Sequence, residues 1–192
     1  MKLELKIVDF LAKEGKELTI HELSVQMDEF YSYIYRTINR LAKEGVITKR
    51  KAGKAFLCSL KFSEKALAML KLAELEKKDD LFGKNKQLKL MLEDFMNLLK
   101  TKSMTVVLFG SYSKGAETEE SDIDVLLIAK NKIEVDRAVK EIYAKYGKEI
   151  SVVNMTEDEF KKQKEKPIIK EIIKSHCIIY NADKFVNMVF EK

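Results

Sequence analysis

Leu108-Phe109-Gly110-Ser111 is separated by ten residues from Asp122-Ile123-Asp124, and these two stretches decide how the chain is interpreted. Residues 104–109 form an apolar and β-branched run that stops at Gly-Ser, and residues 122–129 form a second such run that begins with two carboxylates. Both patterns predict β-strands. Because alternate side chains of a strand share a face, Asp122 and Asp124 should point the same way.

The residue types in this pattern favour a particular chemistry. Two carboxylates about 7 Å apart on a strand suit a hard divalent cation, Mg²⁺ or Mn²⁺, which relieves their mutual repulsion. Gly110 lets the backbone approach a ligand closely, and Ser111 adds a hydroxyl and an amide at the start of a helical turn that favours phosphate. Together they predict metal-assisted phosphoryl or nucleotidyl transfer. The alternative is an exposed strand edge with two solvated acids.

The wider pattern extends through Lys114-Gly115 and Ser121-Asp122-Ile123-Asp124-Val125-Leu126-Leu127. It resembles the minimal nucleotidyltransferases of the DNA polymerase β superfamily over residues 101–192. The tail from Cys177 to Tyr180 and on to Phe185 is similar to the closing strand and helix of those domains. The resemblance implies an α+β fold whose C-terminal nucleotidyltransferase domain has a mixed sheet flanked by helices.

The same resemblance implies roles for individual residues. Asp122 and Asp124 would hold two Mg²⁺ (or Mn²⁺) ions, and Gly110 and Ser111 would cradle the β and γ phosphates of a nucleoside triphosphate, with ATP the expected one. Lys114 would meet the triphosphate as a point charge, or lie in solvent. The chain would then transfer a nucleoside monophosphate group to an acceptor hydroxyl that the sequence does not identify.

The third carboxylate of this superfamily completes the metal site and acts as a base. It is expected within the apolar strand at residues 150–153, where this chain has Ser151. Glu149 is one pleat repeat earlier on the same strand face, so its longer side chain is the candidate replacement, against the alternative of an exposed acid. Without a replacement, the domain would bind Mg²⁺ and nucleotide but transfer slowly or not at all.

The first 62 residues follow a different pattern. Helical periodicity is found at residues 3–12, 19–27 and 30–42, and Thr19 with Glu22 forms a capping box. Two strand-like runs follow at residues 46–50 and 55–60, joined by a turn that contains Gly53. This order resembles a winged helix-turn-helix domain over residues 1–62, which implies binding to double-stranded DNA, often as a homodimer.

DNA contacts would come from the third helix and the hairpin, whose polar and basic residues offer base and phosphate contacts. These candidates are Ser32, Arg36, Asn39, Arg40, Lys49, Arg50, Lys51 and Lys54. Tyr31, Tyr33 and Tyr35 of the same helix offer such contacts too. Some of them should turn inward beside the buried stripe of the helix, however, so core or dimer packing is the alternative for them. For the hairpin lysines the alternative is a solvated turn.

Residues 63–100 predict a helical linker that begins at a Ser63 cap. Its first helix is expected at residues 64–75, and Asp79-Asp80 and Gly83 should interrupt it before a second helix extends to Leu99. A further helix is predicted at residues 132–146, with Val135 and Tyr143 among its inward residues. The transferase domain would then occupy residues 101–192.

Composition limits the remaining possibilities. The 192 residues are 46% hydrophobic and carry a net charge of +5, which is enough apolar content for two cores. No stretch approaches the roughly 18 apolar residues of a membrane span, and Met1-Lys2-Leu3-Glu4 lacks the apolar region of a signal peptide. We therefore expect a cytoplasmic protein without membrane contact. Cys58 and Cys177 should be buried free thiols, and neither His21 nor His176 has zinc-ligand spacing.

Two classes of function remain open. Some members of the resembled family modify a partner protein as antitoxins paired with HEPN toxins, and others act on small molecules, so a HEPN-type partner is one expectation. The alternative is a DNA-binding transcriptional regulator whose degenerate transferase domain binds nucleotide or a partner protein. Ser151 favours the regulator, whereas the intact Gly-Ser and Asp-x-Asp favour the enzyme.

Overall fold

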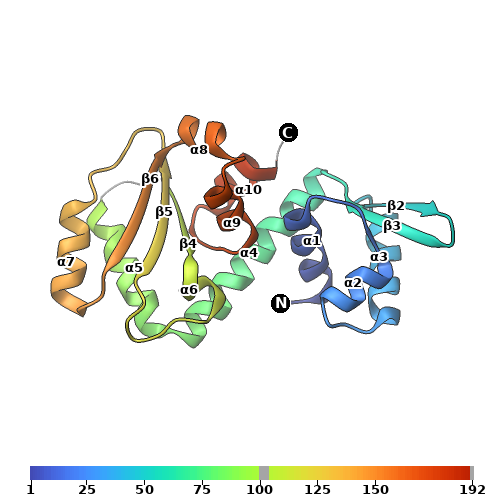
Figure 1. Ribbon diagram of the computed structural model, residues 1–192, viewed down its shortest axis with the longest axis horizontal. Coiled ribbons are helices and arrows are strands. Elements are labelled where there is room, and N and C mark those ends of the chain that lie inside the picture. Colours follow the sequence, from blue (N-terminus) through green and yellow to red (C-terminus); the bar gives the residue numbers. More distant parts are fainter. Residues whose placement is uncertain (100–103, 191–192) are drawn as a thin grey trace. The chain divides into compact units, whose positions relative to one another are not determined.

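The computed structural model describes residues 1–99 and 104–190 of the chain (Figure 1). These residues form two compact units, one from Met1 to Ala73 with the C-terminal residues from Val189, the other from Glu74 to Met188. The predicted boundary between linker and transferase domain, at residues 100–101, lies outside the described residues.

The first unit contains three helices and a small sheet. Its elements are α1 (Leu3–Glu14), β1 (Leu18–Thr19), α2 (Ile20–Gln26), α3 (Tyr31–Lys43), β2 (Ile47–Ala52) and β3 (Ala55–Leu60). The strands are antiparallel in the order β1-β3-β2. The predicted capping box is present at the start of α2, where the Thr19 hydroxyl accepts from the Glu22 amide at 3.1 Å.

The hairpin is longer than the two strand patterns indicate. Ala52 pairs with Ala55, so only Gly53 and Lys54 remain in the turn, and Gly53 adopts a φ of +60° that suits a two-residue hairpin turn. On α3, Ile34, Ile38 and Leu41 are buried, as the helical period predicts.

The predicted break in the linker helix is wrong. A single helix, α4, runs from Glu64 to Lys84, and Asp79, Asp80 and Gly83 lie on its exposed side. One glycine in a helix costs only about 1 kcal/mol relative to alanine, and exposed acids interrupt no packing. The chain breaks at Asn85 instead, whose side chain accepts from the Leu88 amide at 2.9 Å and caps α5 (Lys86–Leu99).

The second unit is built on a mixed four-stranded sheet, which agrees with the predicted α+β class. Its strands are β4 (Met104–Phe109), β5 (Ile123–Ala129), β6 (Ile150–Thr156) and β7 (Cys177–Tyr180), in the order β6-β5-β4-β7. β4 is antiparallel to β5 and β7, whereas β5 and β6 are parallel. Asp122 precedes the first residue of β5, so only Asp124 lies within the strand.

Helices cover both faces of this sheet (Figure 1). The remaining elements are α6 (Gly110–Lys114), α7 (Asp136–Tyr146), α8 (Glu157–Gln163), α9 (Pro167–Lys174) and α10 (Ala182–Phe190). Phe95 of α5 and Ile142 of α7 pack in one core with Val125 of β5. Around the other face, Phe160 of α8 and Phe185 of α10 are fully buried, with ring centroids 5.9 Å apart.

The helix predicted at residues 132–146 begins later than expected. The Ile133 carbonyl accepts from the Asn154 side chain of β6 at 2.7 Å, so it does not start a helical ladder, and α7 begins at Asp136. Tyr143, expected to face inward, is 59% exposed. α7 nevertheless covers the sheet, because Ala138 and Ile142 belong to its core.

Two expectations from composition concern the cysteines and the length of apolar helices. Cys58 and Cys177 are buried free thiols, and burial raises the pKa of Cys58 to about 11. Within residues 1–99 and 104–190, no helix combines the length and apolarity needed to cross a bilayer.

Candidate active site

The site is built where β4 ends against β5. Gly110 follows directly after β4, and its φ of +70° lies in the region that favours glycine. A Cβ at this position would lie 2.1 Å from Oδ2 of Asp124, so a side chain here is excluded by the carboxylate as well as by the backbone. The turn and the carboxylate are therefore in direct contact, although they are separated by fourteen positions in the sequence.

The turn itself is held by side-chain hydrogen bonds. The Ser113 hydroxyl donates to the Gly110 carbonyl at 2.9 Å, and it lies 3.4 Å from the Ser175 carbonyl at the end of α9. Ser111 is half-buried in the first turn of α6. The backbone and hydroxyl of this turn thus present fixed polar groups beside Asp124.

The two aspartates differ in their surroundings. Asp122 is exposed, whereas Asp124 is partly buried. Burial raises the pKa of Asp124 above its usual range, and the negative charge of Asp122 raises that pKa further. A divalent cation between them would remove the repulsion and favour the ionised form, so hard oxygen donors, mutual repulsion and a close backbone turn fit Mg²⁺ or Mn²⁺.

The position of the expected third carboxylate is clear from the sheet register. Asp124 is the partner of Phe109 on one side and of Ser151 on the other, so the three side chains lie abreast on one face. Ser151 is exposed and offers a hydroxyl where the superfamily pattern has an acid. Glu149 is exposed just before β6, where its carbonyl accepts from the Ile123 amide at 2.9 Å.

Glu149 does not complete a three-ligand site in this conformation. In the part of the chain that the structure describes, no three or more His, Cys, Asp and Glu side chains gather in a way that could hold a metal. The structure thus brings together Gly110, Ser111, Asp122 and Asp124, and Glu149 meets them through its backbone carbonyl, which bonds to Ile123, without adding a third metal-holding carboxylate.

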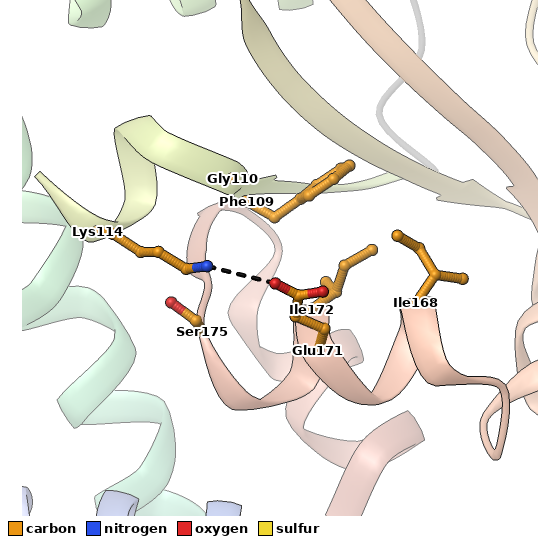
Figure 2. Close-up of a pocket in the computed structure, with 7 residues that line it drawn as sticks. All are labelled: Phe109, Gly110, Lys114, Ile168, Glu171, Ile172 and Ser175. Carbon is orange, nitrogen blue, oxygen red and sulfur yellow. Dashed lines mark hydrogen bonds and ion pairs between the residues drawn. The ribbon is translucent and has the colours of Figure 1, made fainter. Parts of the chain in front are cut away.

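A cavity of about 140 Å³ opens beside the turn, between the end of β4 and α9 (Figure 2). Its lining includes Phe109, Gly110, Ile168 and Ile172, and the Lys114 ammonium spans it to reach Glu171 of α9 at 3.3 Å. Both partners of this ion pair are largely exposed, so it is weak and Lys114 can exchange it for another anion. The sequence pattern pointed to Lys114 but missed Glu171, because nothing local places α9 beside the turn.

The chain was compared with known proteins. The family described as "Polymerase beta, Nucleotidyltransferase" matches residues 86–185, which is more than half of the chain and contains the whole site. The chain belongs to the polymerase beta nucleotidyltransferase family. The match also includes α5, the second helix of the predicted linker, which packs on the transferase sheet as expected.

Curated relatives agree with this assignment. Two proteins of Methanocaldococcus jannaschii that carry the provisional name protein adenylyltransferase are 33% and 30% identical to the chain. The first match covers 56% of this chain and 81% of the relative, and the second covers 46% and 94%. A crystal structure of a toxin-antitoxin with AMP-PNP aligns at 15% identity over 50% of this chain and 77% of that chain, with a TM-score of 0.39. A likeness this weak supports no structural inference.

His176 and Glu74 are buried polar side chains that the sequence did not predict. His176, 4% exposed, lies between α9 and β7 with its Nδ1 3.0 Å from the Ile172 carbonyl. Its Nε2 is 3.4 Å from Oε1 of Glu74 on α4. Because a carbonyl oxygen only accepts, Nδ1 donates to the Ile172 and Ile173 carbonyls, and these bonds fix the orientation of the imidazole at the end of α9.

The predicted DNA contacts of the first unit are only partly available. Arg50 forms a bidentate pair with Glu17 and holds the pKa of that carboxyl below its usual range. Lys49 donates to the Asn39 side chain at 2.6 Å. Arg40 lies 3.4 Å from Glu4. These basic groups would have to exchange partners to meet phosphates.

Other predicted contacts are presented to solvent. Lys51 and Lys54 are exposed at the tip of the hairpin, and Ser32 and Arg36 are exposed on α3. The expectation that some of the three tyrosines turn inward is wrong, since Tyr31, Tyr33 and Tyr35 are 50%, 48% and 39% exposed. Ile34, Ile38 and Leu41 form the buried stripe of α3, and the three tyrosines lie outside it.

Proposed function

We propose that the second unit transfers a nucleoside monophosphate group from a nucleoside triphosphate, ATP first, to a hydroxyl acceptor with the help of Mg²⁺. The observation that carries this proposal is the contact between the Gly110 turn and the Asp124 carboxylate. The backbone turn suits phosphate oxygens and the carboxylate suits cations. A metal-bound triphosphate requires both. Family membership supports the same chemistry.

In the reaction, an acceptor oxygen attacks the α-phosphorus, the bond to the β-phosphate oxygen breaks, and pyrophosphate leaves. Asp122 and Asp124 would hold the ions, and Gly110, Ser111 and Lys114 would bind the β and γ phosphates. Bound Mg²⁺ would supply charge neutralisation at the α-phosphate and at the leaving pyrophosphate. Lys114 would leave Glu171 to do so, which their exposed ion pair permits.

The acceptor's proton needs a destination. Glu149 is the acid that we propose for this role, because it adjoins the register pair formed by Ile123 and Ile150 at the edge of the site. It is exposed and lies off the Asp124–Ser151 row, so we expect slow turnover. Glu149→Gln should lower the rate of pyrophosphate release while nucleotide affinity stays unchanged.

We propose a protein hydroxyl as the acceptor, since the relatives of Methanocaldococcus jannaschii are named as protein adenylyltransferases. A HEPN-type partner protein is the first acceptor to test. We propose that the protein is cytoplasmic and that it forms a homodimer. Sedimentation of the purified protein would check the dimer.

For the first unit we propose a winged helix-turn-helix that binds DNA. Three helices followed by a β-hairpin support it, with a short strand after α1 completing the sheet in the order β1-β3-β2. Lys51 and Lys54 at the hairpin tip are suited to backbone phosphates.

A regulator without turnover is the second candidate, and Ser151 in the row beside Asp124 favours it. The two candidates separate in one experiment, which measures pyrophosphate release and nucleotide binding with Mg²⁺ and a candidate acceptor protein. Turnover that the Asp122→Asn, Asp124→Asn variant abolishes would establish the transferase. Metal-dependent binding without turnover across a set of candidate acceptors would favour the regulator, and absence of both would refute nucleotide use.

A further inference from the structure

The first unit carries an aromatic cluster on its surface, formed by Phe30, Tyr31, Tyr33 and Tyr35 at the start of α3. Their exposed fractions are 76%, 50%, 48% and 39%, while Ile34 between them is fully buried. Solitary exposed apolar residues are common on proteins, but four large rings within six residues form a patch that indicates an interaction site.

The rings are ordered in two pairs. Tyr31 and Tyr35 are stacked, with centroids 6.1 Å apart and planes inclined by 22°. Phe30 and Tyr33 meet edge to face at 5.8 Å. Each of the four side chains is more than one-third exposed, so part of every ring remains in contact with solvent.

Cations stand over the same rings. The Arg36 guanidinium is 5.1 Å from the centroid of Tyr33, and the Lys49 ammonium is 5.0 Å from Tyr35 and 4.0 Å from Phe56. The cluster therefore continues into the basic hairpin, and aromatic and cationic groups alternate on one surface.

The charge of this region indicates what binds there. Residues 30–63 contain eight Lys and Arg and a single acid, Glu44, although the whole chain carries only +5. The net charge of the rest of the chain is therefore slightly negative, and the excess of positive charge lies in residues 30–63, where Arg40 and Arg50 pair with Glu4 and Glu17 from outside this segment. Two copies of so basic a face repel each other, which disfavours dimerisation through it and favours a polyanion.

The rings decide the form of the polyanion. A duplex offers its phosphates and the edges of its paired bases, whereas the flat faces of those bases are stacked on one another and cannot pack on an exposed ring. Unpaired bases offer faces that stack on any aromatic ring, while their phosphates meet lysine and arginine. From this combination we infer that the α3 aromatic cluster and the adjoining hairpin bind single-stranded nucleic acid by stacking.

This inference rests on the nucleic-acid binding proposed for the first unit and specifies its ligand. The test uses the full-length protein and fluorescence anisotropy with a labelled mixed-sequence single strand and with the duplex of the same length. Three variants separate the effects. Tyr31→Ala with Tyr35→Ala removes the stacked pair, Tyr31→Phe with Tyr35→Phe keeps the rings, and Val25→Ala truncates a 65% exposed residue of α2 as a control.

We expect the single strand to bind more tightly than the duplex. Alanine at both tyrosines should weaken single-strand binding about tenfold for each ring, while the phenylalanine and Val25 variants stay within about twofold of the parent protein. Equal or tighter duplex binding, or alanine variants without effect, would overturn the inference.

A second measurement keeps the two proposals apart. Lys51→Gln with Lys54→Gln should weaken binding of both forms and reduce its dependence on salt. If these lysines control duplex binding while the tyrosines are silent, DNA binding stands and the stacking inference falls. If neither form binds, both proposals fall, and sedimentation of the Tyr31→Ala, Tyr35→Ala variant would show whether the cluster joins two copies instead.

Discussion

Two neighbouring positions on one row of the transferase sheet differ in how tightly the surrounding residues constrain them. At the Phe109–Asp124 pair, a glycine with positive φ, a hydroxyl-braced turn and a carboxylate with a raised pKa occupy the same small space. At the next position of the row, Ser151 is exposed, and Glu149 does not gather with the two aspartates into a group that could hold a metal. Residues for holding a charged ligand are thus constrained by their neighbours, whereas the place for a proton acceptor is not. If the proposed function holds, binding and turnover should therefore be separable by substitution.

The largest effect should follow removal of the constrained carboxylate. Asp124→Asn is expected to lower the rate of metal-dependent nucleotidyl transfer at least a hundredfold, since loss of a metal ligand removes several kcal/mol of charge stabilisation. Pyrophosphate release under saturating nucleotide measures it. Asp158→Asn, an exposed acid on α8, is the control. A rate equal to that of the control would separate Asp124 from the reaction.

Gly110→Ala tests whether the turn and the carboxylate are coupled. The new Cβ would meet Oδ2 of Asp124, so we expect a loss of affinity for the metal-bound nucleotide of about tenfold or more, with about 1–3 kcal/mol of backbone strain. Gly115→Ala is a matched control, because Gly115 has a φ of +66° but nothing within 4 Å of its Cβ position. Nucleotide titration measures the affinity and thermal unfolding measures the stability. Equal losses of both in the two variants would mean that the effect comes from backbone conformation alone.

Ser151→Asp should improve the incomplete position. It places a carboxylate beside Asp124 on the same face, which should strengthen Mg²⁺ binding and raise turnover about tenfold if an acceptor is present. Single-turnover kinetics with a candidate acceptor protein is the measurement. Ser151→Asn has a similar size without the charge, and an equal gain from it would rule out a carboxylate effect.

The smallest effect concerns pH. Because the pKa of Asp124 is raised, Mg²⁺-dependent binding should weaken as pH falls through that raised value, above the ordinary aspartate pKa of about 3.9. Asp122→Asn removes the smaller of the two causes, so the pKa of Asp124, followed by NMR without metal, should decrease. An unchanged pKa would leave burial as its whole cause.

The same raised pKa has a consequence for stability. Folding disfavours the ionised form of Asp124, so without metal Asp124→Asn should unfold at a higher temperature than the parent protein at neutral pH. This gain should shrink as pH falls through the folded pKa and vanish below the unfolded pKa of about 3.9.

Local patterns predicted much of this molecule because their causes are local. Alternating and periodic apolar residues located β4, β5, α3 and α5, and a side-chain cap that needs only three residues located the start of α2 at Thr19. The same reasoning failed at Asp79-Asp80, at residues 132–135 and at Tyr143. In the first case the acids and the glycine are exposed and cost the helix little. In the second the Ile133 carbonyl bonds to Asn154 of β6, and in the third Ala138 and Ile142 face the core while Tyr143 is exposed.

The sequence by itself identified the parts of the candidate site, because Gly110, Ser111, Asp122 and Asp124 lie at the end of β4 and the start of β5, which an antiparallel pairing of consecutive strands brings together. Only the tertiary structure decided what surrounds them: Glu171 of α9 beside Lys114, Ser151 abreast of Asp124, and four aromatic rings left on the outside of α3. These depend on sheet register and on which helix packs where, and such contacts between distant residues leave no mark on the local order of the chain.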